Sequence, residues 1–169
     1  MDGQIFDLPT RTITVKGHTI GFDGTTITVD GQSYTVEGRT VLVLQARHEY
    51  QSFSLNDLIA SASDTCELGL NLSRAVITQV ASDEPEDMSG IRDGNTLNDI
   101  VIASDCKSVQ LRSERDLLGN GRVYTISLKV RDASGNQAQK SANVIVPKLL
   151  SGGQATDDGP LYVVSSACN

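Results

Sequence analysis

The sequence predicts an all-β protein in which a five-strand antiparallel meander precedes an antiparallel β-sandwich. Short stretches of alternating apolar and polar residues recur along the 169-residue chain, and Gly, Asn and Asp separate them. Aromatic residues make up only 4% of the chain and Trp is absent, so Val, Ile and Leu must form the core. We expect the meander in residues 1–45, the sandwich in residues 46–148, and a linker with a strand-like tail in residues 149–169.

The N-terminal segment repeats with a period of seven residues. Four glycines mark the repeat, and each follows a charged residue: Gly17, Gly24, Gly31 and Gly38. Asp-Gly between alternating apolar stretches favours a two-residue hairpin turn, because both turn positions need a positive φ. Hairpins of this spacing place one row of residues opposite one another: Ile13, Ile20, Ile27, Tyr34 and Val41. A stacked β-solenoid would produce the same repeat and is the competing geometry.

The second segment has longer polar connections between its strands. In the strand expected at residues 122–130, Tyr124, Ile126, Leu128 and Val130 alternate with polar residues, which is typical of a half-buried strand. After them, Asp132 and Gly135 predict a hairpin turn, because Asp caps its own backbone and Gly supplies a positive φ. Residues 54–62 are the one stretch with a helical pattern. The remaining strands are expected at residues 51–54, 75–80, 99–102, 108–112 and 139–146.

Residues 82–96 contain five carboxylates, more than a surface turn needs. Calcium binds about six to eight oxygen ligands with loose geometry, and Gly90 and Gly94 would let a loop close around an ion. We therefore expect a calcium site, to which Asp132 would add a ligand if its turn lies at the same end of the sandwich. The expected ligands are Asp83, Glu84, Asp87, Asp93, Asn95 and Asp99. The alternative is a solvated acidic loop without an ion.

The segment LRSERD (111–116) brings basic residues next to this acidity. Arginine and carboxylate groups form strong, directional pairs, so we expect Arg112, Glu114 and Arg115 to fix the loops through such pairs. A patch that faces a ligand is the alternative.

No catalytic motif is present: the chain contains no G-x-S-x-G, H-E-x-x-H or P-loop pattern. The two histidines, His18 and His48, are expected at surface or packing positions. We therefore expect no enzyme activity. The net charge of −7 at pH 7 argues against nucleic acid or an anionic membrane as a partner. No apolar run reaches the length of about 18 residues that a membrane span needs.

The three cysteines, Cys66, Cys106 and Cys168, form no CxxC pair, which disfavours zinc and thioredoxin-like chemistry. One disulfide with one odd thiol would indicate an oxidising compartment, and three unrelated thiols are the alternative. The chain starts without a signal-peptide pattern, so we expect either a cytosolic protein or a fragment or mature form of a secreted one.

Several motifs follow one another in a specific order: SASDTC (61–66), SDEPED (82–87), DGNTLNDIVI (93–102), CKSVQLRSERD (106–116), NGRVYTISLKVRDASGN (120–136) and VIVPK (144–148). With these motifs, residues 46–147 resemble an immunoglobulin-like domain of the hyalin-repeat or cadherin-like kind found in large secreted bacterial proteins. The resemblance implies an extracellular or cell-surface location and a disulfide between Cys66 and Cys106. Cys168 would then be left over, available to pair between molecules. Ile91-Arg92 interrupts the GxGDG stretch expected in such domains and places a cation beside the proposed calcium site.

The resemblance makes a non-enzymatic extracellular module the leading function. Stabilised by calcium and a disulfide, it would serve in adhesion or as a spacer, with a protein or a cell-surface polymer as its partner. The alternative is a self-assembling subunit of a fibre or surface layer, because a neighbouring molecule could accept the strand-like tail at residues 161–168. A carbohydrate-binding module is the third possibility, although Trp is absent and the tyrosines are scattered at positions 34, 50, 124 and 162.

Overall fold

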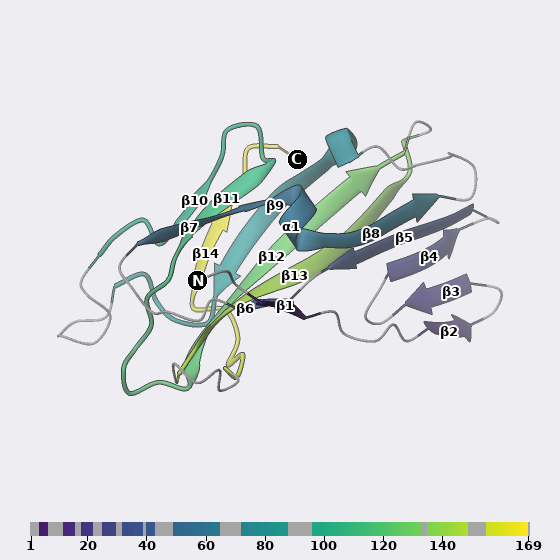
Figure 1. The fold of residues 1–169 in the computed structure, drawn as a ribbon. Coiled ribbons are helices and arrows are strands. Elements are labelled where there is room, and N and C mark those ends of the chain that lie inside the picture. Colours follow the sequence, from purple (N-terminus) through teal and green to yellow (C-terminus); the bar gives the residue numbers. More distant parts are fainter. Residues whose placement is uncertain are drawn as a thin grey trace.

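Where the structure describes the chain, it is all-β apart from two short helical turns (Figure 1). The computed structural model describes residues 49–64, 72–87, 96–132, 135–148 and 155–168, together with six strands in the first 42 residues. One turn of α-helix, α1 (Leu55–Leu58), lies within the stretch predicted to be helical, and a 3-10 helix spans Leu72–Arg74. Across the described ranges, no helix is long and apolar enough to cross a membrane.

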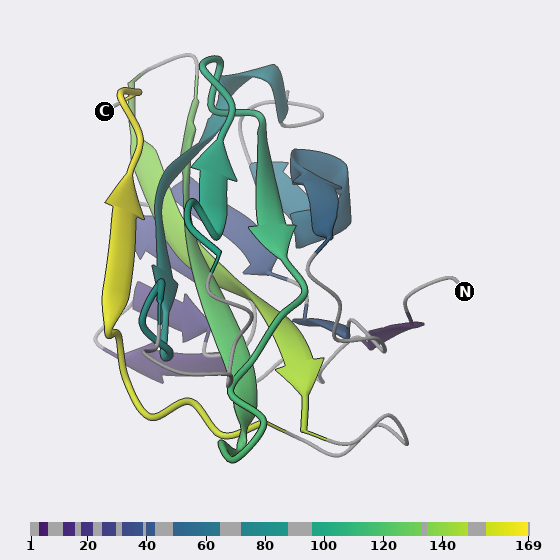
Figure 2. The ribbon, with the colours of Figure 1, turned by 90° about the vertical axis from the view of Figure 1, so that its left-hand side faces the viewer.

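The largest sheet has six strands in the order β1-β6-β13-β12-β9-β14. Four of them, β13, β12, β9 and β14, pair antiparallel, and β6 joins β13 in parallel. β14 forms one edge of this sheet and has β9 as its neighbour, as Figure 2 also shows. The strand bounds are β1 (Gln4–Phe6), β6 (Thr40–Leu42), β9 (Ala75–Ser82), β12 (Gly121–Arg131), β13 (Gln137–Pro147) and β14 (Tyr162–Ser165).

A three-stranded antiparallel sheet packs against the four antiparallel strands and completes a sandwich. Its order is β10-β11-β7, with β7 at Tyr50–Ser54, β10 at Ile100–Ile102 and β11 at Ser108–Arg112. One buried cluster joins the two sheets through apolar residues that alternate along the strands, as a period of two requires. From the smaller sheet it contains Phe53, Ile100, Val109 and Leu111, and from the larger sheet Ile77, Val80, Tyr124, Ile126, Leu128 and Val144.

The N-terminal repeat forms a third sheet, in the order β2-β3-β4-β5-β8. Its pairings place Ile13 opposite Ile20, and Ile27 opposite both Ile20 and Tyr34, as the repeat predicts. These antiparallel neighbours agree with hairpins and not with a stacked solenoid. The strand bounds are β2 (Thr12–Val15), β3 (His18–Gly21), β4 (Thr25–Val29), β5 (Gln32–Gly38) and β8 (Ile59–Asp64).

The predicted fifth strand of the repeat does not pair with the fourth. β5 continues through the expected turn at Glu37 and Gly38, and Tyr34 lies opposite Asp64 of β8 instead of Val41. Val41 belongs to β6, between β1 and β13. The prediction of a Tyr34–Val41 pair was wrong because the C-terminal half of β5 pairs with β8. This non-local pairing replaces the local hairpin. Strand pairing therefore crosses the expected boundary at residue 45.

Gly38 lies where β5 meets β13. A Cβ added at this position would be 2.2 Å from the carbonyl oxygen of Ser141 and 2.9 Å from its carbonyl carbon. Both atoms belong to the backbone, so no side-chain rotation could make room for the added Cβ. The register of β5 on β8 also shifts at Glu37/Gly38. Only glycine lets the two strands approach this closely.

Gly38→Ala is expected to lower the free energy of unfolding by about 1–3 kcal/mol, because the new methyl group overlaps the Ser141 carbonyl. Urea-induced unfolding would measure the loss. Gly135→Asn is the matched control, because no atom lies within 4 Å of a Cβ there and Asn tolerates the positive φ of 89°. The control should lose less than about 1 kcal/mol. Equal losses in both variants would contradict the assigned crossing.

Candidate functional site

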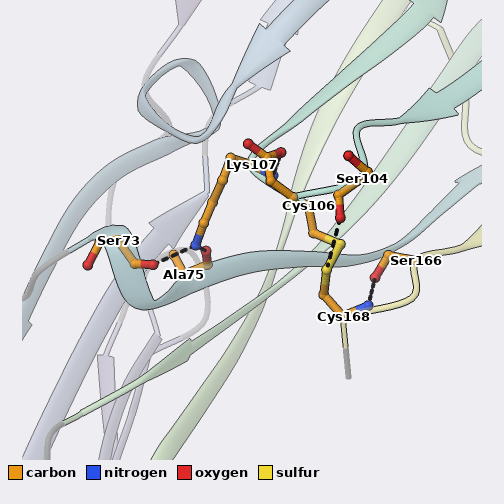
Figure 3. The surroundings of a disulfide bond; sticks show 8 residues. Ser73, Ala75, Ser104, Cys106, Lys107, Ser166 and Cys168 are labelled. Atoms are coloured by element: carbon orange, nitrogen blue, oxygen red, sulfur yellow. Dashed lines mark hydrogen bonds between the residues drawn. A yellow bond between two sulfur atoms is a disulfide. The ribbon is translucent and has the colours of Figure 1, made fainter.

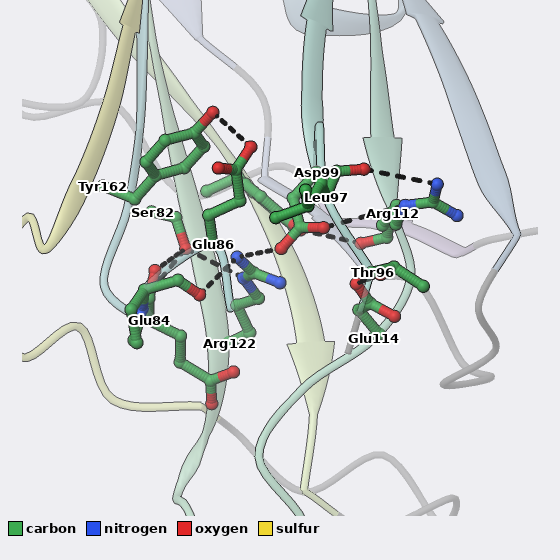
Figure 4. Close-up of polar contacts among 12 residues, drawn as sticks. Ser82, Glu84, Glu86, Thr96, Leu97, Asp99, Arg112, Glu114, Arg122 and Tyr162 are labelled. Atoms are coloured by element: carbon green, nitrogen blue, oxygen red, sulfur yellow. Dashed lines mark hydrogen bonds and ion pairs between the residues drawn. The ribbon is translucent and has the colours of Figure 1, made fainter. Parts of the chain in front are cut away.

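The sandwich contains a buried charge, the guanidinium of Arg122 in β12 (Figure 4). Its Nη2 lies 2.8 Å from Asp99 Oδ2, and both residues have an exposed fraction of 0%. Nε donates to Ser82 Oγ at 2.8 Å, and Nη2 also donates to the carbonyl of Pro85 at 3.3 Å. The guanidinium carbon lies 4.8 Å from the centre of the Tyr124 ring. Arg122 therefore connects the end of β9, the start of β10 and its own strand.

Backbone pairing positions the two charges. Arg122 precedes Tyr124 by two residues, so both side chains lie on the same face of β12. Asp99 directly precedes β10, and its carbonyl accepts a hydrogen bond from the amide of Arg112 at 2.9 Å. The Tyr124 hydroxyl donates to the carbonyl of Arg112 at 2.8 Å. Arg112 of β11 thus holds two of the residues that contact Arg122, Asp99 through its amide and Tyr124 through its carbonyl.

A second set of charges surrounds this pair. Arg112 Nε lies 3.7 Å from Asp99 Oδ1, and its guanidinium carbon is 4.3 Å from the centre of the Tyr50 ring. Glu114 is buried with 2% exposure, and the Thr96 hydroxyl donates to its Oε1. Two acids and two arginines therefore occupy one end of the sandwich interior and its rim.

Burial raises the pKa of Asp99 to about 7, and the neighbouring Glu114 carboxyl acts in the same direction. Arg122 opposes this shift by stabilising the ionised form. Two acids that share one buried region resist carrying two negative charges. At neutral pH the Asp99 carboxyl therefore titrates, whereas an exposed aspartate would be fully ionised.

Two of the predicted calcium ligands, Asp83 and Glu84, follow β9 and are buried. Asp83 Oδ1 accepts the amide hydrogen bond of Val123 at 2.8 Å, and Glu84 Oε2 accepts that of Asp116 at 2.8 Å. Burial raises the pKa of both carboxyls above their ordinary values. Asp83 Oδ2 and Glu84 Oε1 are among the buried side-chain atoms of the described chain that have no hydrogen-bond partner.

The other predicted ligands are distributed differently. Asp87 is exposed, and Asp99 already faces Arg122. Asp132 caps its own turn by accepting the backbone and side-chain amides of Asn136 at 2.7 and 2.8 Å. Asp93 and Asn95 lie outside the described residues. Within the part of the chain that is described, no three acidic, histidine or cysteine side chains form a group that could hold a metal ion. The described residues alone therefore do not provide a calcium site.

The basic residues of the LRSERD segment fix loops by two different means. Arg112 pairs with the carboxylate of Asp99, as predicted. Arg115 instead donates to backbone carbonyls, from Nε to Pro147 at 2.9 Å and from Nη2 to Lys148 at 2.5 Å. These bonds tie the connection between β11 and β12 to the end of β13.

The structure pairs Cys106 with Cys168 (Figure 3), so the predicted Cys66–Cys106 bond was wrong and Cys168 is not a free thiol. Their Cα atoms are 6.3 Å apart. Cys66 lies outside the described residues. β14 runs antiparallel to β9 and therefore carries Cys168 towards the β10–β11 turn, where the Cys106 carbonyl accepts the amide of Ile77 at 2.9 Å. Lys107 of that turn donates to the carbonyls of Ser73 and Ala75.

Sequence reasoning missed Arg122, although the sequence contained a signal for it. The alternation at Tyr124, Ile126, Leu128 and Val130 extends one step back to residue 122, so an arginine is due on the buried face. A buried arginine needs a buried carboxylate, and Asp99, the first residue of the strand predicted at 99–102, was a candidate. Neither charged group is exposed among the described residues, and the two groups face one another.

The free energy of unfolding is expected to fall as the pH rises from 5 to 8. Because the folded pKa of Asp99 is raised to about 7, the stability it contributes is fully present below its unfolded pKa and is lost as the pH rises through 7. One such proton changes stability by at most about 1.4 kcal/mol per pH unit.

Asp99→Asn should flatten this profile by up to that amount, since Asn cannot ionise. Urea unfolding at half-unit pH steps would measure both proteins. The control is Glu49→Gln, which changes an exposed acid and should follow the wild-type profile. A wild-type profile that rises from pH 5 to 8, or one that Asp99→Asn leaves unchanged, would contradict the assignment.

Comparison with known proteins leaves the family open. No family model matches the chain, and comparisons with curated proteins and with solved structures give no significant match. The observed architecture is a sandwich of two packed antiparallel sheets with one described disulfide, and the likeness to a particular immunoglobulin-like family rests on the sequence motifs quoted above.

Proposed function

We propose that this protein is a non-enzymatic module of an extracellular or cell-surface protein, used in adhesion or as a spacer, with an immunoglobulin-like sandwich behind an N-terminal β-meander. The observation that carries the proposal is the Cys106–Cys168 disulfide. Structural disulfides form and persist in oxidising compartments and are rare in the cytosol. This one fastens the end of the last described strand to the opposite sheet.

The polar groups of the sandwich support a scaffold more than a reaction. Arg122, Asp99 and Glu114 are buried and bind one another or the backbone, so their charges hold segments in place. The Tyr124 ring, which a sugar-binding surface would expose, is fully buried. A carbohydrate-binding function gains no support from this residue.

Cys168→Ser is expected to lower the free energy of unfolding by about 4 kcal/mol, because the disulfide closes a loop of 62 residues. Non-reducing urea unfolding would measure the loss, and limited proteolysis at neutral pH would show faster cleavage, as expected of a spacer that depends on the bond.

Cys106→Ser should cost a similar amount, and the double variant no more than either single one, because all three remove the same bond. Cys66→Ser is the control and should leave stability near that of the wild type. A neutral Cys168→Ser, or a Cys66→Ser variant that loses as much, would contradict both the pairing and the function based on it.

We also propose that calcium stabilises the acidic connection after β9, through Asp83, Glu84 and Asp87 together with Asp93, Asn95 and Asp99. The unpartnered oxygens Asp83 Oδ2 and Glu84 Oε1 support this proposal, since a buried carboxylate oxygen without a partner is costly and a cation would satisfy it. The Arg122–Asp99 pair makes Asp99 the least suited of the six, because its charge is already balanced.

Millimolar calcium is expected to raise the thermal midpoint of the non-reduced protein by several degrees relative to a chelator, because a ligand that binds only the folded state stabilises it. Asp87→Asn should reduce the shift, because it removes a proposed calcium ligand. Asp87 is exposed, so the substitution disturbs no packing. Glu49→Gln is the matched control and should keep the full shift. An identical midpoint with calcium and with chelator would remove the metal from the proposal.

A self-assembling subunit is the alternative function. It is favoured by one observation, the position of β14 at the edge of the six-stranded sheet. Residues 148–161 connect β14 to β13.

A further inference from the structure

We propose that the β9 edge accepts β14 from a second copy of this chain, and that the Cys106–Cys168 disulfide decides which copy supplies the strand. The inference rests on the alternative function, self-assembly, and specifies its surface, its partner and its control. When the bond is closed within one chain, the molecule is a monomer. When the bond re-forms between chains, it links two copies covalently.

The seat of β14 is well defined. Four residue pairs join it antiparallel to β9, from Tyr162 opposite Ser82 to Ser165 opposite Gln79. Two backbone hydrogen bonds extend the pairing, from the Leu161 amide to the Ser82 carbonyl at 2.8 Å and from the Ser166 amide to the Thr78 carbonyl at 2.9 Å. A second copy carries the same strand and would reproduce every one of these contacts.

Side chains of β14 also cover part of the core. Tyr162 and Val164 pack on the buried cluster, and the Tyr162 hydroxyl donates to Glu86 Oε1 at 2.7 Å. Val163 and Leu161 face outward with 44% and 68% exposure. Without β14, the backbone of β9 and this part of the core would be left open, and an open strand edge is a template for another strand.

The strand is short, and among the described strands it pairs with a single neighbour. It has four residues, and it lies at the sheet edge with β9 on its single paired side. The connection from β13 spans residues 148–161 and includes Gly152 and Gly153. Fully extended, a connection of 14 residues spans about 46 Å. The Asn120 side-chain amide donates to Asp158 of this connection at 2.8 Å, and the disulfide adds a covalent bond to these contacts.

The exchange is a balanced thiol–disulfide reaction. A dithiol such as dithiothreitol donates two electrons and two protons to the Cys106–Cys168 bond. Cys106 and Cys168 become thiols, and dithiothreitol becomes a cyclic disulfide. After β14 has moved to another copy, oxidised glutathione accepts two electrons and two protons for each new bond. Each bond then joins Cys106 of one chain to Cys168 of the other.

Two complementary full-length variants test the inference. The acceptor chain carries Cys66→Ser with Cys168→Ser and keeps only Cys106. The donor chain carries Cys66→Ser with Cys106→Ser and keeps only Cys168. The two chains are mixed at high concentration in a glutathione redox buffer and analysed by non-reducing electrophoresis and intact mass. A mixed dimer should exceed either homodimer severalfold, because the strand seat brings Cys106 and Cys168 together.

Val164→Pro in the donor chain is the matched control. It removes a backbone donor in the middle of β14 and should reduce the mixed dimer to the level of the homodimers. A second measurement does not depend on these variants: the Cys66→Ser chain, reduced and reoxidised at increasing concentration, should give a growing fraction of covalent dimer.

Mixed dimer no more abundant than homodimer, or unaffected by Val164→Pro, would overturn the inference, as would reoxidation that yields only monomer at every concentration. These results would leave the monomeric module intact, since its own test is the stability lost in Cys168→Ser.

Discussion

The need to balance the charge of Arg122 is the constraint on which the sandwich depends. A guanidinium inside a low-dielectric core is tolerated only with a counter-charge and filled hydrogen bonds. Here the partners come from two places in the chain: Ser82 at the end of β9 with Pro85 just after it, and Asp99 before β10. A single side chain on β12 thus specifies where two connections between the sheets must run. The ion pair therefore adds a directional contact to the apolar packing between the two sheets.

The acidic connection after β9 also has a structural role. Asp83 and Glu84 hold the amides of Val123 and Asp116, so the carboxylates that follow β9 serve the backbone of β12 and of the loop before it. Acids that were interpreted as ligands therefore have structural duties as well. Two of their oxygens have no hydrogen-bond partner among the described residues, and the proposed calcium site rests on this observation.

Local patterns predicted local structure well and long-range pairing poorly. The register of β2 to β5 followed from the seven-residue repeat, and the cap of Asp132 with the positive φ of Gly135 followed from turn chemistry. The predicted pairing of the fifth strand was wrong because β8, which is distant in sequence, pairs with the edge of β5. The predicted disulfide partner was wrong for the same reason: nothing near Cys106 in sequence indicates that β14 lies beside β9. Arg122 could have been found by extending one alternation by a single step.

The disulfide also determines how the molecule would respond to tension. A pull on the two chain ends enters at Cys168 and crosses the sulfur–sulfur bond to Cys106, so the force bypasses residues 107–167. β11, β12, β13 and β14 lie in this bypassed stretch and cannot be drawn out while the bond is closed. Only the chain before Cys106 can lengthen. The disulfide thus divides the module into an extensible stretch before Cys106 and a stretch of fixed length after it.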